Sequence, residues 1–271
     1  MSINNNISLV GSLCKQIHLD SKASVRICRN KFRQEVQYHR KLWEMVWIYN
    51  ILEQKGMLRP GRKGLGFGCG EEYLVPALAA QGVEVTASDQ DKEAAEKSGS
   101  IATDQYSDSL ASFEKWLPRF CDKDSFYNNV QYKCIDMNDI PDSCNEQFDF
   151  NWSACSLEHL GSLQKGIDFI INSMKTLKSG GIAIHTTEYN VYSNDKTLEH
   201  PATSIYRKQD IERLLITAKD LGFNACEVDF STGDLVNDDK IDMPPYTQDP
   251  HLKLQFDGYT CTSIGIFIEK P

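Results

Sequence analysis

The chain has 271 residues, of which 41% are hydrophobic and 25% are charged, so it contains enough apolar material for a folded core. Its formal net charge of -9 at pH 7 repels a polyanion, which argues against nucleic acid as a partner. The sequence has neither a run of about 18 apolar residues nor the order of a signal peptide at residues 1–20. We therefore expect a cytoplasmic protein without membrane insertion. The nine cysteines form no Cys-x-x-Cys pair, which favours reduced thiols over disulfides or structural zinc.

The first long element is expected to be a helix at residues 33–58, because apolar residues recur there at helical spacing. Pro60 and Gly61 then end it. Residues 1–60 are accordingly expected to form a helical N-terminal cap. An exposed apolar side of the long helix would suit a homodimer contact, although the sequence leaves the oligomeric state open.

After that break, short apolar runs alternate with amphipathic stretches, which is typical of βαβ units in a parallel sheet. Strands are expected at residues 63–67, 83–88, 130–135, 148–153, 182–187, 223–230 and 261–269. Helices are expected at residues 71–81, 91–97, 107–116, 163–177 and 208–221. The sequence therefore predicts an α/β fold, a Rossmann-like, seven-stranded, mostly parallel sheet with helices on both faces.

Two further regions complete the predicted organisation. A cofactor-binding core is expected at residues 61–190, and the C-terminal part of the core at residues 191–271. Within the latter, residues 231–259 are long for a loop and rich in Asp, Pro and aromatic residues. We expect this segment to cover the substrate, although a surface loop fixed by its prolines fits the same composition.

The strongest local motif is the glycine-rich stretch from Gly64 to Glu72, which lies between an expected strand and an expected helix. Glycines at alternate positions let the backbone turn sharply and let a ligand approach its amides. Counted from Gly66, the third glycine is one place too early for the dinucleotide fingerprint, so an NAD site is disfavoured. Glu71 and Glu72 would also repel a pyrophosphate, whereas a cationic sulfonium ligand with an amino group would not be repelled.

The next expected strand ends at Asp89, which lies 23 residues after Gly66. This spacing is close to that at which an acidic side chain meets ribose hydroxyls in such folds. A helix N-cap is the simpler alternative for Asp89.

On these motifs, residues 62–188 resemble the class I S-adenosylmethionine-dependent methyltransferases. The resemblance implies S-adenosylmethionine as cofactor and S-adenosylhomocysteine as product. It implies that the glycine loop holds the methionine part, that Asp89 holds the ribose, and that an acid after the third strand lies near the adenine. The cofactor-binding residues are then expected to be Gly66, Gly68, Gly70, Glu71, Asp89, Gln90, Asp136, Met137 and Ser153. The family commonly has an acid two positions before the first loop glycine, where this chain has Gly64, and Glu71 or Glu72 could replace it.

Glu/His pairs follow the fourth and fifth expected strands, at Glu158-His159 and at His185 with Glu188. Methyl transfer to a hydroxyl requires an in-line acceptor and removal of its proton, a task that suits histidine. We therefore expect these four residues to be catalytic, with either histidine as base. The same residues could bind Mg, Mn or Zn, but compact metal-ligand spacing is missing from the sequence, and we disfavour a metal.

The segments after these strands also look like methyltransferases that are often encoded with bacterial surface-polysaccharide genes. That likeness implies a small polar acceptor, namely a sugar, a nucleotide sugar or a glycan-linked group, modified on oxygen. The substrate-binding residues are then expected to be Tyr189, Arg207, Tyr246, His251 and Lys253.

Three alternatives remain at the level of sequence. An N-methyltransferase of a small metabolite fits the same fold. An NAD-dependent oxidoreductase or epimerase shares the sheet but lacks support from the glycine spacing. A non-catalytic relative would retain the cofactor fold as a scaffold.

Overall fold

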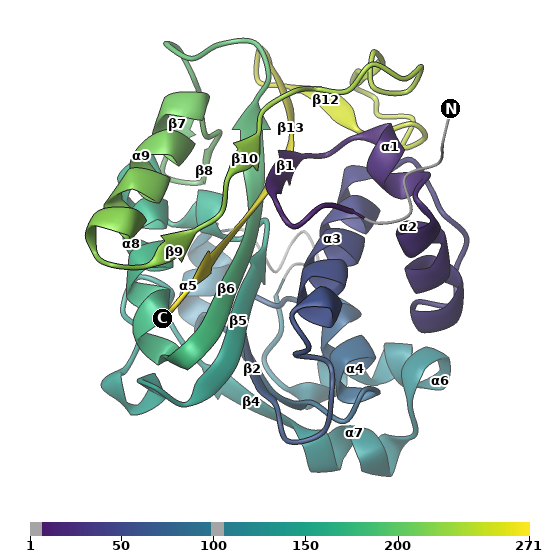
Figure 1. Ribbon diagram of the computed structural model, residues 1–271, viewed down its shortest axis with the longest axis vertical. Helices are drawn as coiled ribbons and strands as arrows, with labels where there is room; N and C mark the ends of the chain where they lie inside the picture. The colour runs from purple at the N-terminus through teal and green to yellow at the C-terminus, as the bar shows by residue number, and fades with distance from the viewer. Residues whose placement is uncertain (1–6, 99–105) are drawn as a thin grey trace.

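The computed structural model describes residues 7–98 and 106–271, and its central feature is one large twisted sheet (Figure 1). Its main path runs through β10 (Val228–Asp229), β1 (Gly11–Leu13), β13 (Tyr259–Glu269), β6 (Leu177–Asn190), β5 (Phe148–Ala154), β2 (Lys63–Phe67), β3 (Glu84–Asp89) and β4 (Val130–Cys134). Short strands β9 (Asn224–Ala225) and β12 (Lys253–Phe256) pair with β13, and β11 (Ile241–Asp242) pairs with β12. A separate hairpin joins β7 (Glu199–His200) and β8 (Thr203–Ser204).

Helices cover both faces of this sheet. One side carries α3 (Arg40–Gln54) and α4 (Leu74–Ala79), and the other carries α8 (Leu163–Ser173) and α9 (Lys208–Asp220), as Figure 1 shows. The remaining helical segments are α1 (Gln16–Leu19), α2 (Lys22–Arg26), α5 (Lys92–Ser98), α6 (Leu117–Phe120), α7 (Lys123–Asn129), the π-helical η1 (Ile27–Lys31) and the 3-10 turns η2 (Leu110–Trp116), η3 (Asp142–Cys144), η4 (Leu157–His159) and η5 (Met174–Thr176).

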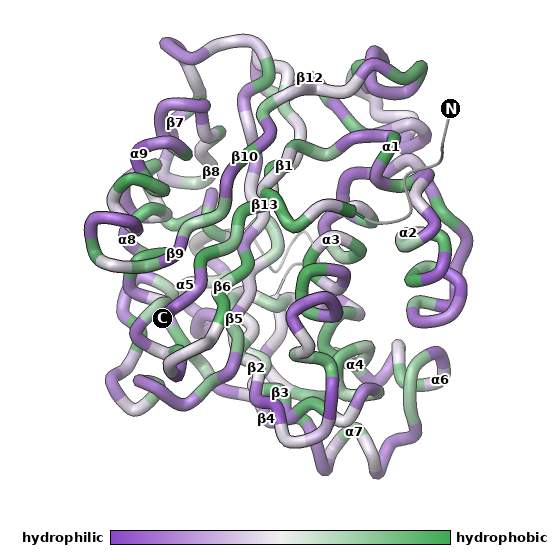
Figure 2. The backbone as a smooth tube through the Cα atoms, viewed as in Figure 1, coloured by the Kyte–Doolittle hydropathy of each residue, from purple (hydrophilic) through white to green (hydrophobic). Residues whose placement is uncertain are grey.

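The predicted fold class is confirmed, because β4, β3, β2, β5 and β6 pair in parallel and only β13 reverses next to β6. β5 and most of β6 are buried, as expected for strands with helices on both faces. Figure 2 shows the hydrophobic stretches gathered along these central strands and along α3. The described residues form eleven strands in this sheet rather than the predicted seven.

Two of the four extra strands follow from an unexpected insertion at one edge of the sheet. The predicted strand at residues 223–230 is split in two, since β9 pairs with β13 whereas β1 separates β13 from β10. Gly11 permits this insertion, because a Cβ there would lie 2.7 Å from Val228 Cγ2 and 3.0 Å from the Gly265 carbonyl oxygen. Part of the predicted helical cap is thus a strand of the main sheet.

The long N-terminal helix begins later than predicted, at Arg40 rather than residue 33. The His39 ring accepts a hydrogen bond from the Lys41 amide at 3.1 Å and caps the helix. The prediction that α3 has an exposed apolar side is wrong, because Trp43 and Trp47 are fully buried between the sheet and the preceding short helices. That surface is consequently not available for the predicted homodimer contact.

The segment at residues 231–259 also differs from an open covering loop. It forms β11 and β12, and its His251 forms a β-bridge with His39. The segment therefore packs against the start of α3. All nine cysteines are free thiols, and none of the described helices is long and apolar enough to span a membrane.

Candidate active site

A cavity of about 620 Å³ opens at the carboxyl ends of the parallel strands. Its walls come from residues 68–72 after β2, residues 89–90 at the end of β3, residues 135–138 after β4 and residues 154–156 at the end of β5. The chain leaves β2 toward β3 on one side and later adds β5 on the other, so the cavity lies at the topological switch point. Ligands bind at this point in open α/β sheets.

The glycine loop forms the floor of this cavity. β2 continues through Phe67, so the turn begins at Gly68, and both Gly68 and Gly70 adopt positive φ, +57° and +49°. A Cβ at Gly68 would lie 2.8 Å from the Ser156 side chain, so the close approach of these backbones requires glycine. Both predicted loop glycines thus line the cavity.

Gly66 does not line the cavity, which corrects its predicted placement in the loop. It lies inside β2, where a Cβ would meet the indole of Trp152 at 2.4 Å. The position two residues before Gly66, where the family commonly has an acid, is Gly64, and a Cβ there would lie 2.4 Å from the Phe150 ring. The loop therefore lacks an acid at this position for a steric reason.

Asp89 connects the strand end to the glycine loop. Its carboxylate accepts hydrogen bonds from the backbone amides of Gly70 at 2.9 Å, Gln90 at 2.8 Å and Ser107 at 3.3 Å. Burial raises the pKa of Asp89 to about 6, partly offset by these amides. The carboxylate retains lone pairs for further donors, and both Asp89 and Gln90 line the cavity.

The wall after β4 combines apolar and polar groups. Ile135 and Met137 are nearly fully buried and line the cavity, and Met137 Sδ lies 3.4 Å from where a Cβ of Gly68 would be. Asp136 accepts a hydrogen bond from the Asn138 amide at 2.8 Å. Such a wall suits a flat heteroaromatic ring with polar edges.

The described cavity lining carries more negative than positive charge. It includes the carboxylates Glu44, Glu71, Glu72, Asp89 and Asp136, against the lysines Lys41 and Lys115. This imbalance favours a cationic ligand. Glu71 is already paired with Lys115, whereas Glu72 accepts a hydrogen bond from Trp152 Nε1 at 2.8 Å. The sequence did not indicate Lys41 or Glu44, because α3 brings them to the cavity from far along the chain.

The two predicted bases lie in different environments. His159 in η4 is exposed and lines the cavity, and its Nδ1 lies 2.7 Å from the Ala202 carbonyl oxygen. A carbonyl only accepts, so Nδ1 carries the proton and the neutral ring has its lone pair on Nε2.

His185 is fully buried on the α8 side of the sheet. Its Nδ1 is 2.8 Å from Ser153 Oγ, and burial lowers the pKa of His185 to about 3. Neither His185 nor Ser153 is among the cavity-lining residues, which corrects their predicted roles. Strand alternation explains this placement, because the two residues are register partners on β6 and β5 and share one face of the sheet.

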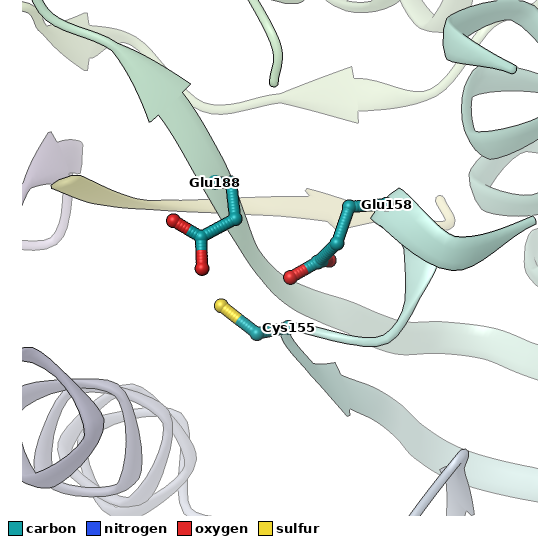
Figure 3. Close-up of side chains that lie close together, drawn as sticks. All are labelled: Cys155, Glu158 and Glu188. Carbon is teal, nitrogen blue, oxygen red and sulfur yellow. The ribbon is translucent and has the colours of Figure 1, made fainter. Parts of the chain in front are cut away.

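Glu158 and Glu188 meet beside the cavity together with Cys155, rather than with the histidines (Figure 3). One carboxylate oxygen of each glutamate and the Cys155 Sγ lie within 4.8 Å of one another. Arg40 approaches this group and pairs with Glu188 at 2.6 Å. Because a guanidinium already supplies positive charge there, the arrangement favours an internal ion pair over a bound metal ion.

Glu44 extends this group toward α3. It is fully buried and accepts hydrogen bonds from Cys155 Sγ at 3.1 Å and Ser263 Oγ at 2.5 Å. Arg40 also lies 3.4 Å from it. We refer to Arg40, Glu44, Cys155, Glu158, Glu188 and Ser263 as the buried charge cluster.

The five predicted substrate residues do not line the cavity. Four of them have contacts elsewhere, namely Tyr189 with Phe230, Arg207 with Asp210, Tyr246 with the Gln255 carbonyl and His251 with Asp242, and Lys253 is buried in β12. The sequence predicted them as substrate-binding residues because polar and aromatic side chains at expected strand ends and loops can bind a sugar. Their side chains instead stabilise the C-terminal elements.

Part of the chain matches a known family model, and the fold matches solved structures. Residues 65–185 match a family model described as "Methyltransferase domain". A Bacillus halodurans structure described as a "putative methyltransferase" is 16% identical, with a TM-score of 0.50 over 81% of this chain and 97% of that chain. No curated protein matches the sequence at a significant level.

Two further solved structures have slightly lower similarity. An S-adenosylmethionine-dependent methyltransferase from Clostridium acetobutylicum is 14% identical, with a TM-score of 0.49 over 90% of this chain and 96% of that chain. A "putative sarcosine dimethylglycine methyltransferase" from Galdieria sulphuraria is 18% identical, with a TM-score of 0.47 over 68% of this chain, and only 60% of that chain is covered. Residues 65–185 thus match a methyltransferase family model, and the chain shares its fold with a solved structure described as a methyltransferase.

Proposed function

We propose that this protein transfers the methyl group of S-adenosylmethionine to a hydroxyl of a small polar acceptor, with His159 as the general base. The observation that carries the proposal is the position of His159, whose Nδ1 is held by the Ala202 carbonyl at the wall of the same cavity that Gly68 and Asp89 line.

The cofactor fits the chemistry of the cavity wall. Asp89 would accept hydrogen bonds from the ribose hydroxyls, and Ile135 and Met137 would pack on the adenine, with Asp136 at its polar edge. Gly68 and Gly70 would let the cofactor approach the backbone of the loop. The bound cofactor supplies an electrophilic methyl group on a sulfonium sulfur.

The residues of the chain then act on the acceptor. His159 Nε2 accepts the hydroxyl proton, while the Ala202 carbonyl stabilises the imidazolium that results through the Nδ1 hydrogen bond. Glu158, which precedes it in η4, accepts a hydrogen bond from Thr187 Oγ1 at 3.1 Å and is buried, and burial raises its pKa. We assign Glu158 a positioning role, because its contact fixes η4 against β6.

A sugar, nucleotide sugar or glycan-linked group is our proposed acceptor class. Its support is the sequence resemblance to methyltransferases encoded with polysaccharide genes. The cavity adds Lys41, Lys115 and the Trp116 ring, which suit a sugar carrying a phosphate or carboxylate. The five residues predicted to bind the substrate lie outside the cavity lining and give this acceptor class no support.

An N-methyltransferase of a small amine is the second candidate. The excess of carboxylates in the cavity lining supports it, because a protonated amine would be attracted there. Such an acceptor must lose its proton before attack, so His159 would serve both reactions.

The test is the release of S-adenosylhomocysteine when the protein and S-adenosylmethionine are incubated with separate pools of sugars, nucleotide sugars and amines. Turnover with a sugar pool supports the first proposal, and turnover with amines alone replaces it with the second. Cofactor binding without turnover in any pool would favour the scaffold alternative.

A further inference from the structure

The methionine part of the cofactor brings an ammonium group into the cavity, and this inference rests on the proposed function. An ammonium removed from water requires an anionic partner or several hydrogen-bond acceptors. The residues that line the described cavity offer five carboxylates for this purpose. Most of them already have polar partners.

Glu71 pairs with Lys115, and Glu44 lies between Lys41 and Arg40 at 3.4 Å from each. Both carboxylates are therefore already matched by cations of the chain. Asp89 accepts three backbone amides.

Asp136 lies on the wall after β4, where it accepts the Asn138 amide. Glu72 differs from all of these, because among the described residues it has no ion-pair partner within 4.0 Å. Its side chain accepts a hydrogen bond from the neutral indole of Trp152.

Trp152 places this carboxylate beside the glycine loop. Its indole occupies the space next to Gly66, where a Cβ would lie only 2.4 Å from the ring. Gly66 and Trp152 are register partners on β2 and β5, and the indole passes from there to Glu72 at 2.8 Å. The Trp152 ring therefore excludes a side chain at Gly66. The same ring orients the carboxylate of Glu72, which lies at the other end of the glycine loop.

The electrostatics of Glu72 are consistent with a missing cation. Burial raises the pKa of Glu72 to about 8, with the Trp152 hydrogen bond acting in the opposite direction. The nearby charges are Glu44 and Asp89, which raise this pKa, and Lys41, which lowers it. The Cys69 thiol is the other titratable neighbour.

We infer that Glu72, held by Trp152, binds the ammonium group of the methionine part of S-adenosylmethionine, in place of the acid that the strand cannot carry at Gly64. Glu72 is thus a cofactor-binding residue whose hydrogen-bond donor, Trp152, lies in β5. The neighbouring Glu71 contributes little to binding of this ammonium group, because its carboxylate is already paired with Lys115.

The experiment compares two ligands by calorimetry on the full chain. S-adenosylhomocysteine carries the amino-acid part, and 5′-methylthioadenosine has the same nucleoside and thioether without it. Glu72→Gln should weaken S-adenosylhomocysteine at least about ten-fold, because a charge-assisted contact is lost. The same variant should change methylthioadenosine affinity less than about two-fold.

Glu71→Gln is the matched control and should weaken both ligands equally and by less than about three-fold. Trp152→Phe keeps most of the ring volume but removes the donor, and it should shift S-adenosylhomocysteine affinity in the same direction as Glu72→Gln. In the native protein, S-adenosylhomocysteine affinity should rise from pH 6 to 8 relative to methylthioadenosine, because the ammonium binds ionised Glu72.

The outcomes distinguish a failure of the Glu72 inference from a failure of the proposed function. If both ligands bind and Glu72→Gln weakens them equally, the inference is overturned while the proposed function stands. If neither ligand binds the native protein, the proposed function itself fails. Ligand-selective loss in Glu72→Gln with a flat pH profile in that variant supports the inference.

Discussion

The two walls of the cavity are built in different ways. The wall proposed to hold the cofactor, here called the cofactor wall, comes from short turns after β2, β3 and β4, and it is built of backbone amides and one carboxylate, Asp89. The wall proposed to face the acceptor, here called the acceptor wall, comes from α3 and the end of β5, and the buried charge cluster beside it links Glu44 to Ser263 across 219 residues. Local sequence determines the first wall, whereas long-range ion pairs determine the second.

This comparison can be tested first on the stability of the acceptor wall. Arg40→Met removes the guanidinium that faces Glu188 and Glu44, which leaves Glu188 without its ion-pair partner and Glu44 with Lys41 as its remaining one. The free energy of unfolding should fall by about 3–5 kcal/mol, as measured by urea denaturation without ligand.

The control for Arg40→Met is Arg26→Met, which breaks an exposed pair with Glu53. That variant should lose less than about 1 kcal/mol. Equal losses in the two variants would show that the cluster around Arg40 does not hold the acceptor wall together.

The second test separates chemistry from cofactor binding. His159→Ala should lower kcat about 100-fold or more with the acceptor found by screening, because the base is lost. S-adenosylhomocysteine affinity, measured by calorimetry, should change less than about two-fold.

His185→Gln provides the comparison for this variant, and its loss of kcat should be far smaller, since His185 lies outside the cavity lining. A larger loss in His185→Gln than in His159→Ala would reverse the assignment of the base.

The third test concerns pH and the face of the sheet opposite the acceptor wall. Burial lowers the pKa of His185 to about 3, below its ordinary 6.5, so below pH 6.5 the unfolded chain binds more protons at this residue. Stability from His185 is complete above pH 6.5 and is lost as pH falls. Between pH 6.5 and 5 the native protein should lose about 2 kcal/mol more than His185→Gln, as measured by urea titration. Equal losses would contradict the buried neutral state.

The smallest expected effect is on the cofactor wall. Asp89→Asn retains the shape but weakens the acceptor for the Gly70 and Gln90 amides and for the ribose. S-adenosylhomocysteine and methylthioadenosine affinities should both fall about ten-fold in calorimetry. A selective loss of one ligand would place Asp89 away from the ribose.

The same contrast explains what the sequence predicted. The strand pattern predicted the parallel core, and Gly68, Gly70 and Asp89 could be placed because each lies at the end of a strand or in the turn that follows it. Trp152 and Glu72 could not be paired in advance, since their contact depends on the register of β2 with β5. His185 and Ser153 do not line the cavity, because side chains alternate along a strand and these two register partners share the face of the sheet that carries α8.

Long-range packing accounts for the remaining differences. The hydrophobic pattern of α3 did not indicate which side is covered, and Lys41 and Glu44 reach the cavity only because the helix lies across β5 and β6. Likewise, the insertion of β1 beside β13 depends on the small size of Gly11 at a distant contact. Neither feature has a local sequence signal.

The most direct test of the account is calorimetric titration of the full chain with S-adenosylmethionine and, separately, with NAD. We predict saturable binding of S-adenosylmethionine and no heat of binding with NAD, because the cavity lining is rich in carboxylates and suits a cation. Binding of NAD, or of neither ligand, would contradict the central claim.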